Sequence, residues 1–253
     1  MVKIVRLFAL VAAFAAPSAA LEPEALNDYL EGRFYEAAEK TAHLEQADSQ
    51  AFSARAILAG YICADSPTDN ASLVRAERHA RAALSIDPEH EEARIQLAIA
   101  LGLQSRLMPK MEAHESGIGE LSRKLAESVL EDSPNDPFAH GYLAVWNVEV
   151  IRRGGALGRL FLGASFKDAR KHYEAAERSM PDDPALHWQY ARALAAQNPK
   201  KHRKEIRAVL AKALAASPQD RVQEVMHGRA VWLADAMASR QWDDIEDMAR
   251  EML

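Results

Sequence analysis

Small and apolar residues recur every three or four positions along most of the chain, which is the spacing of one face of an α-helix. Four such stretches each run into a proline, which ends a helix because its ring removes a donor and clashes with the preceding turn. A second helical stretch follows each proline. The four successions are 76–83, Pro88 and 92–101; 122–126, Pro134 and 138–146; 169–176, Pro181 and 185–194; and 206–213, Pro218 and 222–236. The pattern predicts an all-α chain of repeated helical hairpins.

Two of the hairpins carry extra residues. Pro88, Pro134 and Pro181 are spaced more widely than Pro181 and Pro218, and the surplus falls between paired helices, at 102–120 and 147–165. Insertions in helical arrays tend to form loops on one face, often the binding face. We therefore expect two inter-helix insertions that border a binding site.

The repeated unit resembles the tetratricopeptide repeat, which is usually about 34 residues long. The matching residues are Ala169, Tyr173 and Pro181; Ala76, Ala83 and Pro88; the turn at 32–37; and a closing helix at 241–249. The resemblance covers nearly the whole chain and implies an α-solenoid of about five tetratricopeptide-like hairpins.

The two consecutive insertions, with the run 158–169, resemble the helical domain of the regulator of microtubule dynamics family. This resemblance spans roughly 72–200. In that family the domain is linked to membranes, and one member binds and transfers phospholipids. The family's membrane anchor and tethering motif are not visible in this sequence, so the resemblance implies lipid handling alone.

The first helix of each pair in such an array lines the inner, concave surface, and its inward residues recur at three- and four-residue steps. The resulting groove is mostly apolar with two arginines, which suits an acyl chain whose headgroup meets a cation. The alternative is that these residues are packed core beneath the insertions. The candidate groove residues are Ile95, Ile99, Leu103, Phe138, Val145, Trp188, Arg192, Val225, Arg229 and Trp232.

The first twenty residues have the pattern of a secretory signal peptide. Lys3 and Arg6 precede an apolar run, and Ser18 and Ala20 are small residues at the positions that a cleavage site requires. A retained anchor helix is the alternative. We expect a signal peptide at 1–20, a repeat array at 21–253, and a periplasmic location.

Charge is unevenly distributed along a chain whose formal net charge is −6. Residues 21–100 hold 15 acids and 7 bases, whereas 150–212 hold 6 acids and 14 bases. The acidic total argues against nucleic acid as a partner, because nucleic-acid binders usually carry a basic excess. The basic segment at 150–212 suits an anionic membrane surface, or is simply a solvated face.

The sequence lacks the familiar enzyme signatures. The nine histidines are scattered without metal-ligand spacing, and the glycines at 154, 155 and 158 follow no strand, so neither a catalytic or metal site nor a cofactor is expected. We therefore expect a non-catalytic periplasmic binding module whose groove holds a lipid or amphiphile. The alternative is a protein-interaction scaffold or accessory subunit of an envelope transport or assembly complex.

Overall fold

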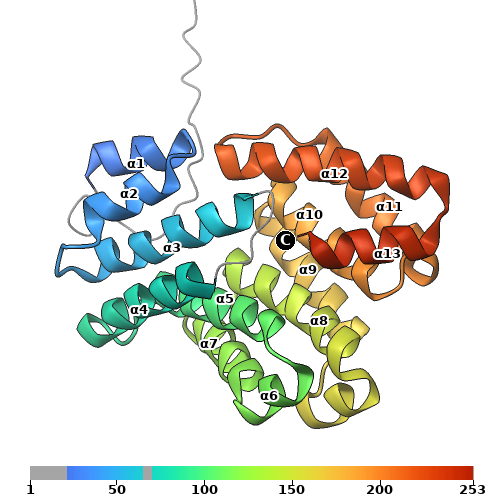
Figure 1. Ribbon diagram of the computed structural model, residues 1–253, viewed down its shortest axis with the longest axis horizontal. Coiled ribbons are helices and arrows are strands. Elements are labelled where there is room, and N and C mark those ends of the chain that lie inside the picture. Colours follow the sequence, from blue (N-terminus) through green and yellow to red (C-terminus); the bar gives the residue numbers. More distant parts are fainter. Residues whose placement is uncertain (1–21, 65–69, 253) are drawn as a thin grey trace, which may run out of the picture.

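The computed structural model describes residues 22–64 and 70–252, and all regular structure within these ranges is helical (Figure 1). This confirms the prediction of an all-α chain, while the predicted signal peptide at 1–20 lies outside the described residues. In chain order the helices are α1 (Pro23–Leu30), α2 (Phe34–Thr41), α3 (Ala47–Cys63), α4 (Asn70–Ile86), α5 (Glu91–Leu107), α6 (Lys110–Glu115), α7 (Ile118–Asp132), α8 (Pro137–Leu162), α9 (Phe166–Ser179), α10 (Pro184–Gln197), α11 (Pro199–Ala215), α12 (Arg221–Ser239) and α13 (Trp242–Glu251).

Neighbouring helices pack in chain order, which makes the fold an α-solenoid. Within the described ranges, five hairpins form the array: α1 with α2, α3 with α4, α5 with α7, α8 with α9, and α10 with α11. Helices α12 and α13 follow the last hairpin and pack on α10 and α11. The predicted hairpin array with two insertions is therefore confirmed.

The four boundary prolines lie in short loops between successive helices, as the sequence predicts. In each loop the residue two positions after the proline caps the next helix by accepting a hydrogen bond from a backbone N–H. These caps follow Pro88, Pro134, Pro181 and Pro218 and are His90, Asp136, Asp183 and Asp220. A capping side chain contributes about 1 kcal/mol to helix stability. The proline thus ends one helix, and the capping residue two positions later begins the next.

Three of these loops share a second contact, made by the residue six positions after the proline. Arg94 donates from Nε to the carbonyl of Pro88 at 3.3 Å. His140 and His187 donate from Nε2 to the carbonyls of Pro134 and Pro181, at 3.1 and 2.8 Å. The carbonyls accept hydrogen bonds that the loop itself cannot provide. This recurrent contact shows that the hairpins are repeats of one structural unit.

Alanine dominates the contacts between helices. Ala76, Ala80 and Ala83 of α4 are fully buried, as is Ala169 of α9. Small side chains at this spacing let helices approach closely, so the chain gains stability from close packing of many small groups. Larger anchors fill the remaining space, and among these Trp188 is fully buried.

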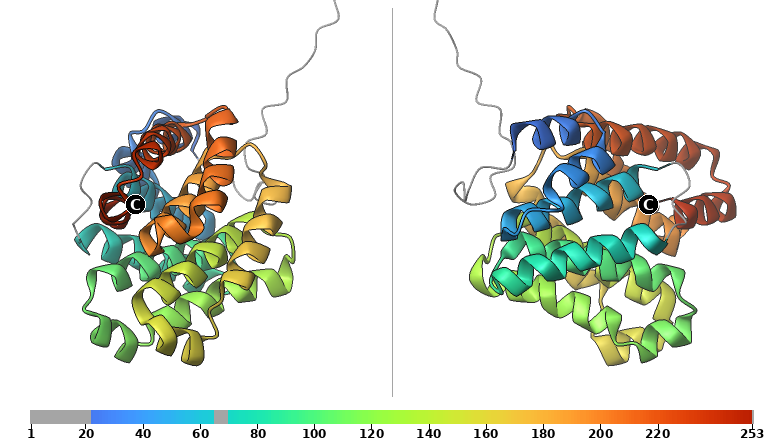
Figure 2. Two further views of the ribbon diagram at one scale, coloured as in Figure 1. Left: turned by 90° about the vertical axis from the view of Figure 1, so that its right-hand side faces the viewer. Right: turned by 60° about the vertical axis from the view of Figure 1, so that its left-hand side comes forward.

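The two ends of the array meet. Helix α12 contacts α1 and α3, so the N-terminal and C-terminal units lie side by side (Figures 1 and 2). Arg229 of α12 ties them together by donating to the carbonyl of Ile62 at 2.7 Å and to that of Ala64 at 3.0 Å. The solenoid therefore closes on itself, and its inner faces surround a common space.

The insertions are mainly helical, unlike the loops that the sequence analysis anticipated. The first extends α5 to Leu107 and adds the short helix α6. The second extends α8 to Leu162 across a break at Gly155, whose φ of 56° and ψ of −134° interrupt the helix. The residues after this break, 156–162, are mostly good helix formers and include no proline, so the helix continues until Gly163, whose φ is 69°. Both insertions lie at the same end of the molecule, where α6 and the end of α8 are adjacent (Figure 1).

Candidate functional site

A cavity of about 850 Å³ lies inside the closed array. Its walls come from α1, α3, α5, α6, α7, α8, α10 and α12, so residues far apart in the sequence face one space. The volume falls near the upper end of the range of roughly 300–1,000 Å³ that is typical of ligand pockets. Its apolar lining includes Leu58, Ile62, Ile99, Leu103, Phe138, Val145, Val150, Leu186, Val222 and Met226.

Five of the ten residues predicted for the groove line this cavity: Ile99, Leu103, Phe138, Val145 and Arg192. They come from α5, α8 and α10, which confirms that the first helix of each of these hairpins faces inward.

The other five predicted groove residues are placed elsewhere. Ile95 packs with Val129 and Leu143 in the core between α5, α7 and α8, and Trp188 is fully buried in the largest core cluster. Val225 packs against that same cluster, Arg229 joins the two ends of the array, and Trp232 is 49% exposed.

In α12 the cavity is lined by Val222 and Met226, not by Val225 and Arg229. The prediction assumed that α12 faces inward as the first helices of earlier hairpins do. Helix α12 instead packs against α10 and α11 and also contacts α1 and α3 across the closure, so a different face of it meets the cavity. The inward row is therefore shifted along the helix.

A paired cation lies in the cavity wall near α1. Arg55 of α3 forms an ion pair with Glu92 at 3.2 Å, and its guanidinium lies over the rings of Tyr29 and Phe52 at 5.2 and 4.9 Å. Its charge is balanced by one carboxylate and two aromatic faces. This end of the cavity is electrically neutral.

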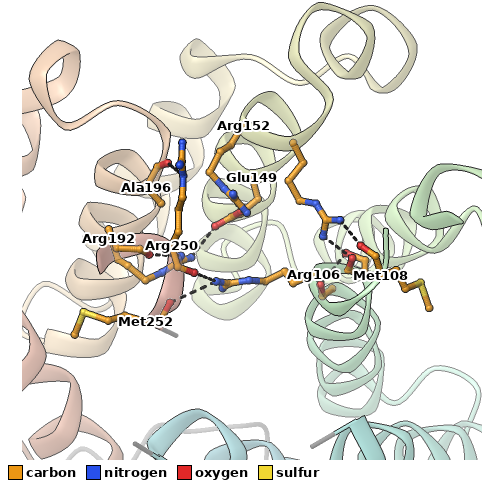
Figure 3. Close-up of polar contacts among 12 residues, drawn as sticks. Arg106, Met108, Glu149, Arg152, Arg192, Ala196, Arg250 and Met252 are labelled. Atoms are coloured by element: carbon orange, nitrogen blue, oxygen red, sulfur yellow. Dashed lines mark hydrogen bonds and ion pairs between the residues drawn. The ribbon is translucent and has the colours of Figure 1, made fainter. Parts of the chain in front are cut away.

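A second group of cations surrounds Glu149, and we call Arg106, Arg152, Arg192 and Glu149 the arginine cluster. Arg152 binds Oε2 of Glu149 at 2.7 Å, and Arg192 binds Oε1 at 2.9 Å (Figure 3). Burial opposes ionisation of Glu149, but the charges of Arg192, Arg106 and Arg152 outweigh it and lower its pKa to about 2. Glu149 is therefore a carboxylate at all physiological pH values.

Arg106 belongs to the cluster but has no carboxylate partner in the described part of the chain. Its Nη2 donates to the carbonyls of Arg250 and Met252 at 3.1 and 3.4 Å, so it reaches from α5 to the end of α13 (Figure 3). Burial, followed by the charge of Arg192, lowers the pKa of Arg106. A guanidinium nevertheless stays protonated in proteins. The cluster therefore holds three buried or half-buried positive charges and one negative charge.

Exposed apolar side chains surround the cavity at the insertions. Met111 of α6 and Leu157 and Phe161 of α8 line the cavity, yet they are 68%, 65% and 67% exposed. Leu107 and Leu160 are exposed beside them, and we call these five residues the apolar lip. Because Met111, Leu157 and Phe161 line the cavity and are also exposed on the surface, the cavity opens to solvent at the apolar lip.

Sequence reasoning missed Arg106 and Glu149, although a signal was present. Arg106 continues the inward row of Ile99 and Leu103 by one more step of three residues, and Glu149 follows Val145 by four. Extending each predicted row by one helical turn would have added Arg106 and Glu149 to the predicted groove, which already included Arg192.

The basic segment at 150–212 is mostly exposed, and three of its residues connect helices of successive hairpins. Arg192 binds Glu149, Arg170 binds Glu205 at 2.7 Å, and Lys212 binds Glu177. Among the exposed bases are Lys200, Arg203 and Lys204 on α11.

A scan against protein-family models finds no match for this chain, and a search of curated proteins finds no similar sequence. In the described ranges, no helix has the length and apolar character needed to span a bilayer. In those same ranges, the histidine, cysteine and carboxylate side chains form no group of three that could hold a metal ion.

Proposed function

We propose that the protein is a non-catalytic binding module whose closed helical array holds a lipid or similar amphiphile in its central cavity. The observation that carries the proposal is the cavity of about 850 Å³, whose wall is largely apolar and which opens at the apolar lip. Each methylene group that leaves water for such a wall contributes about 0.8 kcal/mol. An acyl chain would therefore bind tightly without further specific contacts.

The opening at the apolar lip supports an amphiphile over a small polar metabolite. Exposed large side chains such as Met111, Leu157 and Phe161 cost solubility unless they serve a contact. Next to a cavity opening, they would shield an acyl chain from water while it enters. A polar ligand would need a wall of hydrogen-bonding groups, which the apolar side chains of α5 and α8 do not provide.

A cavity-filling variant tests the proposal. Val145 is half-buried and lines the cavity, so Val145→Trp should occupy part of the acyl space. We expect affinity for a fluorescent long-chain fatty acid to fall at least tenfold, as measured by titration. The matched control is Val231→Trp, because Val231 is 40% exposed on α12. Wild-type protein that binds no long-chain amphiphile would refute the proposal, as would a Val145→Trp variant that binds as well as the control.

Native mass spectrometry offers a second test that needs no chosen probe. Protein purified from its own host under mild conditions should retain a small apolar molecule. Its mass should be absent from the spectrum of the Val145→Trp variant.

We also propose a distant relationship to tetratricopeptide proteins, in particular to the regulator of microtubule dynamics family. The proline-bounded helical hairpins and the two insertions support it. For location we propose the periplasm, on the pattern of residues 1–20 alone. Cell fractionation with N-terminal sequencing tests the location, and a cytoplasmic protein that starts at Met1 would contradict it.

The alternative function, a protein-interaction scaffold, is favoured by one feature of α12. Val231 and Trp232 are adjacent, and they are 40% and 49% exposed. Aromatic residues of this kind are common at protein interfaces. Crosslinking in the envelope separates the two functions: a stoichiometric partner lost on Trp232→Ala but kept on Val145→Trp would favour the scaffold.

A further inference from the structure

The arginine cluster is out of charge balance in a place where imbalance is costly. Arg192 is 1% exposed and Glu149 is 14% exposed. Both oxygens of Glu149 are already bound, one by Arg152 and one by Arg192. Arg106 has no carboxylate partner in the described ranges and is held by main-chain carbonyls alone. Unpaired buried charge is strongly unfavourable, so a protein that retains it generally uses it.

The arginine cluster reaches the cavity wall. Arg106 and Arg192 both line it, and so does Glu149 between them. In the described ranges, the buried Nε of Arg192 has no hydrogen-bond partner, although its Nη2 binds Glu149. Two guanidinium groups from different helices thus reach one polar place in an otherwise apolar wall.

The end of α13 offsets this charge only in part. The carbonyls of Ala249, Arg250 and Met252 accept hydrogen bonds from Arg192 and Arg106 at 3.1–3.4 Å. Carbonyls near a helix C-terminus carry a partial negative charge of roughly half an electron in total. Such a dipole orients the two arginines, but among the described residues it leaves more than one positive charge of the cluster without a counter-ion.

We propose that Arg106 and Arg192 bind the carboxylate or phosphate group of an anionic amphiphile whose acyl chain occupies the cavity. This inference rests on the proposed function and specifies its ligand class. A guanidinium pairs well with both anions because its donors form a planar fork that matches two oxygens. Glu149 and the end of α13 position the two arginines, whose positive charge disfavours a cationic headgroup.

Arg55 differs from the arginine cluster in its charge balance, although it is one of several other cations in the wall, which include Lys110 and Arg153. Arg55 is paired with Glu92 at 3.2 Å and is covered by aromatic rings. It has a carboxylate partner of its own, whereas Arg106, Arg152 and Arg192 share the single carboxylate of Glu149. We therefore place the headgroup at the arginine cluster and the acyl chain along the inner faces of α5 and α8.

Competition between ligands with the same chain and different headgroups tests this assignment. Laurate, dodecyl phosphate and dodecanol would each displace a fluorescent fatty acid from the full chain. A charge-assisted hydrogen bond is about twice as strong as a neutral one. We expect laurate and dodecyl phosphate to bind at least tenfold more tightly than dodecanol. Inorganic phosphate at millimolar concentration should displace nothing.

Variants connect the preference to the arginines. Arg106→Met keeps the length of the side chain and should abolish the preference for anions while dodecanol binds as before. Arg106→Lys should restore part of the preference. The matched control is Arg159→Met, since Arg159 is exposed and lies outside the cavity wall. Binding of dodecanol, together with the circular dichroism spectrum, shows that each variant is folded.

The outcomes distinguish this assignment from the proposed function. Absence of binding by all three chain ligands would refute the proposed function itself. Equal affinity for laurate and dodecanol in the wild type would overturn the anion site alone, as would an undiminished preference in Arg106→Met. Inorganic phosphate that binds as tightly as dodecyl phosphate would overturn it in favour of a free-anion site. If Arg106→Met does not fold, the wild-type comparison still decides.

Discussion

Arg229 of α12 donates a hydrogen bond of 2.7 Å to the carbonyl of Ile62 at the end of α3, 167 positions earlier in the chain. A second bond to Ala64 at 3.0 Å makes this a two-point clasp between the first and last parts of the array. Most repeat arrays are held only by contacts between neighbouring units. Here a long-range contact adds a constraint that local stacking does not supply.

Removing the clasp should loosen the closure without unfolding individual hairpins. We expect Arg229→Met to lower the free energy of unfolding by about 2 kcal/mol, since hydrogen bonds to charged groups contribute roughly 1.5–3 kcal/mol. Denaturant unfolding measures this loss, and hydrogen exchange should accelerate at the end of α3. The control is Arg221→Met on the same helix, which removes an exposed ion pair to Glu224 and should cost less than about 1 kcal/mol. Equal losses in the two variants would contradict a clasp.

Two tryptophans that the sequence placed in one groove should behave differently. Trp188 is fully buried in the largest core cluster, so Trp188→Ala should destabilise the protein by about 3–5 kcal/mol. Trp232 is 49% exposed, and Trp232→Ala should change the stability by no more than about 0.5 kcal/mol. Thermal unfolding of both variants checks the contrast. A large loss from Trp232→Ala would show that its side chain is covered in solution.

Adjacent glycines in α8 provide a matched pair for the apolar lip. Gly155 has a φ of 56° and ψ of −134°, a conformation that only glycine adopts readily, so Gly155→Ala should cost about 1–3 kcal/mol. Gly154 lies in helical backbone, and Gly154→Ala should stabilise the helix by about 0.5–1 kcal/mol. An added Cβ meets no other atom within 4 Å at either glycine, so the difference arises from the backbone.

Only one substitution of this pair should change the rate of ligand exchange. Gly155→Ala would redirect Leu157 and Phe161 at the cavity opening, and we expect the dissociation rate of a fluorescent fatty acid to change severalfold. Gly154→Ala should leave that rate near the wild-type value. Stopped-flow displacement measures both, and identical rates in all three proteins would mean that the break does not control the opening.

Acid should destabilise the protein partly through His79. Burial, with smaller contributions from Arg78 and Arg75, lowers the pKa of His79 to about 4, and its Nδ1 lies 2.7 Å from Oε1 of Gln50. The unfolded chain takes up this proton near pH 6.5, whereas the folded protein does not until about pH 4. The free energy of unfolding should therefore fall between pH 6.5 and 4, by roughly 3 kcal/mol from this residue.

A variant without the titrating group isolates this contribution. His79→Gln should show a smaller loss of stability over the same pH interval, in denaturant titrations at pH 7, 5.5 and 4. Some dependence should remain, because burial also lowers the pKa of His172 to about 4. The same pH dependence in wild type and variant would argue against a neutral, buried His79.

The hairpin architecture could be predicted because its signals are local. A proline such as Pro181 followed by an acidic cap such as Asp183 marks a helix boundary whatever the surroundings. The inward faces of α5 and α8 could also be predicted from the sequence, since helical periodicity fixes which residues share a face. Ile99, Leu103, Phe138 and Val145 line the cavity for that reason.

The rest depends on contacts between distant segments. The position of α12 depends on its packing against α10, α11 and the first helices of the array together, so periodicity alone misassigned its inward row. Arg106 gains its environment from α8, α10 and α13, none of which is close to it in the sequence. The position of α6 beside the end of α8, where His114 lies near the ring of Phe161, likewise joins segments far apart in the sequence. The charge balance of the arginine cluster therefore depends on which helices pack together, and helical periodicity alone does not predict it.

The repeated proline loops have different consequences for residues added within a hairpin and for a whole hairpin added to the array. Three of the four boundaries are specified within seven residues, from a proline to the side chain that returns to its carbonyl six positions later. Sequence added on the far side of a hairpin, as at α6 and the end of α8, leaves these boundaries untouched. A whole additional hairpin would instead push α12 away from α3 and open the ring. The architecture therefore tolerates variation in the shape of its opening much better than variation in the number of its repeats.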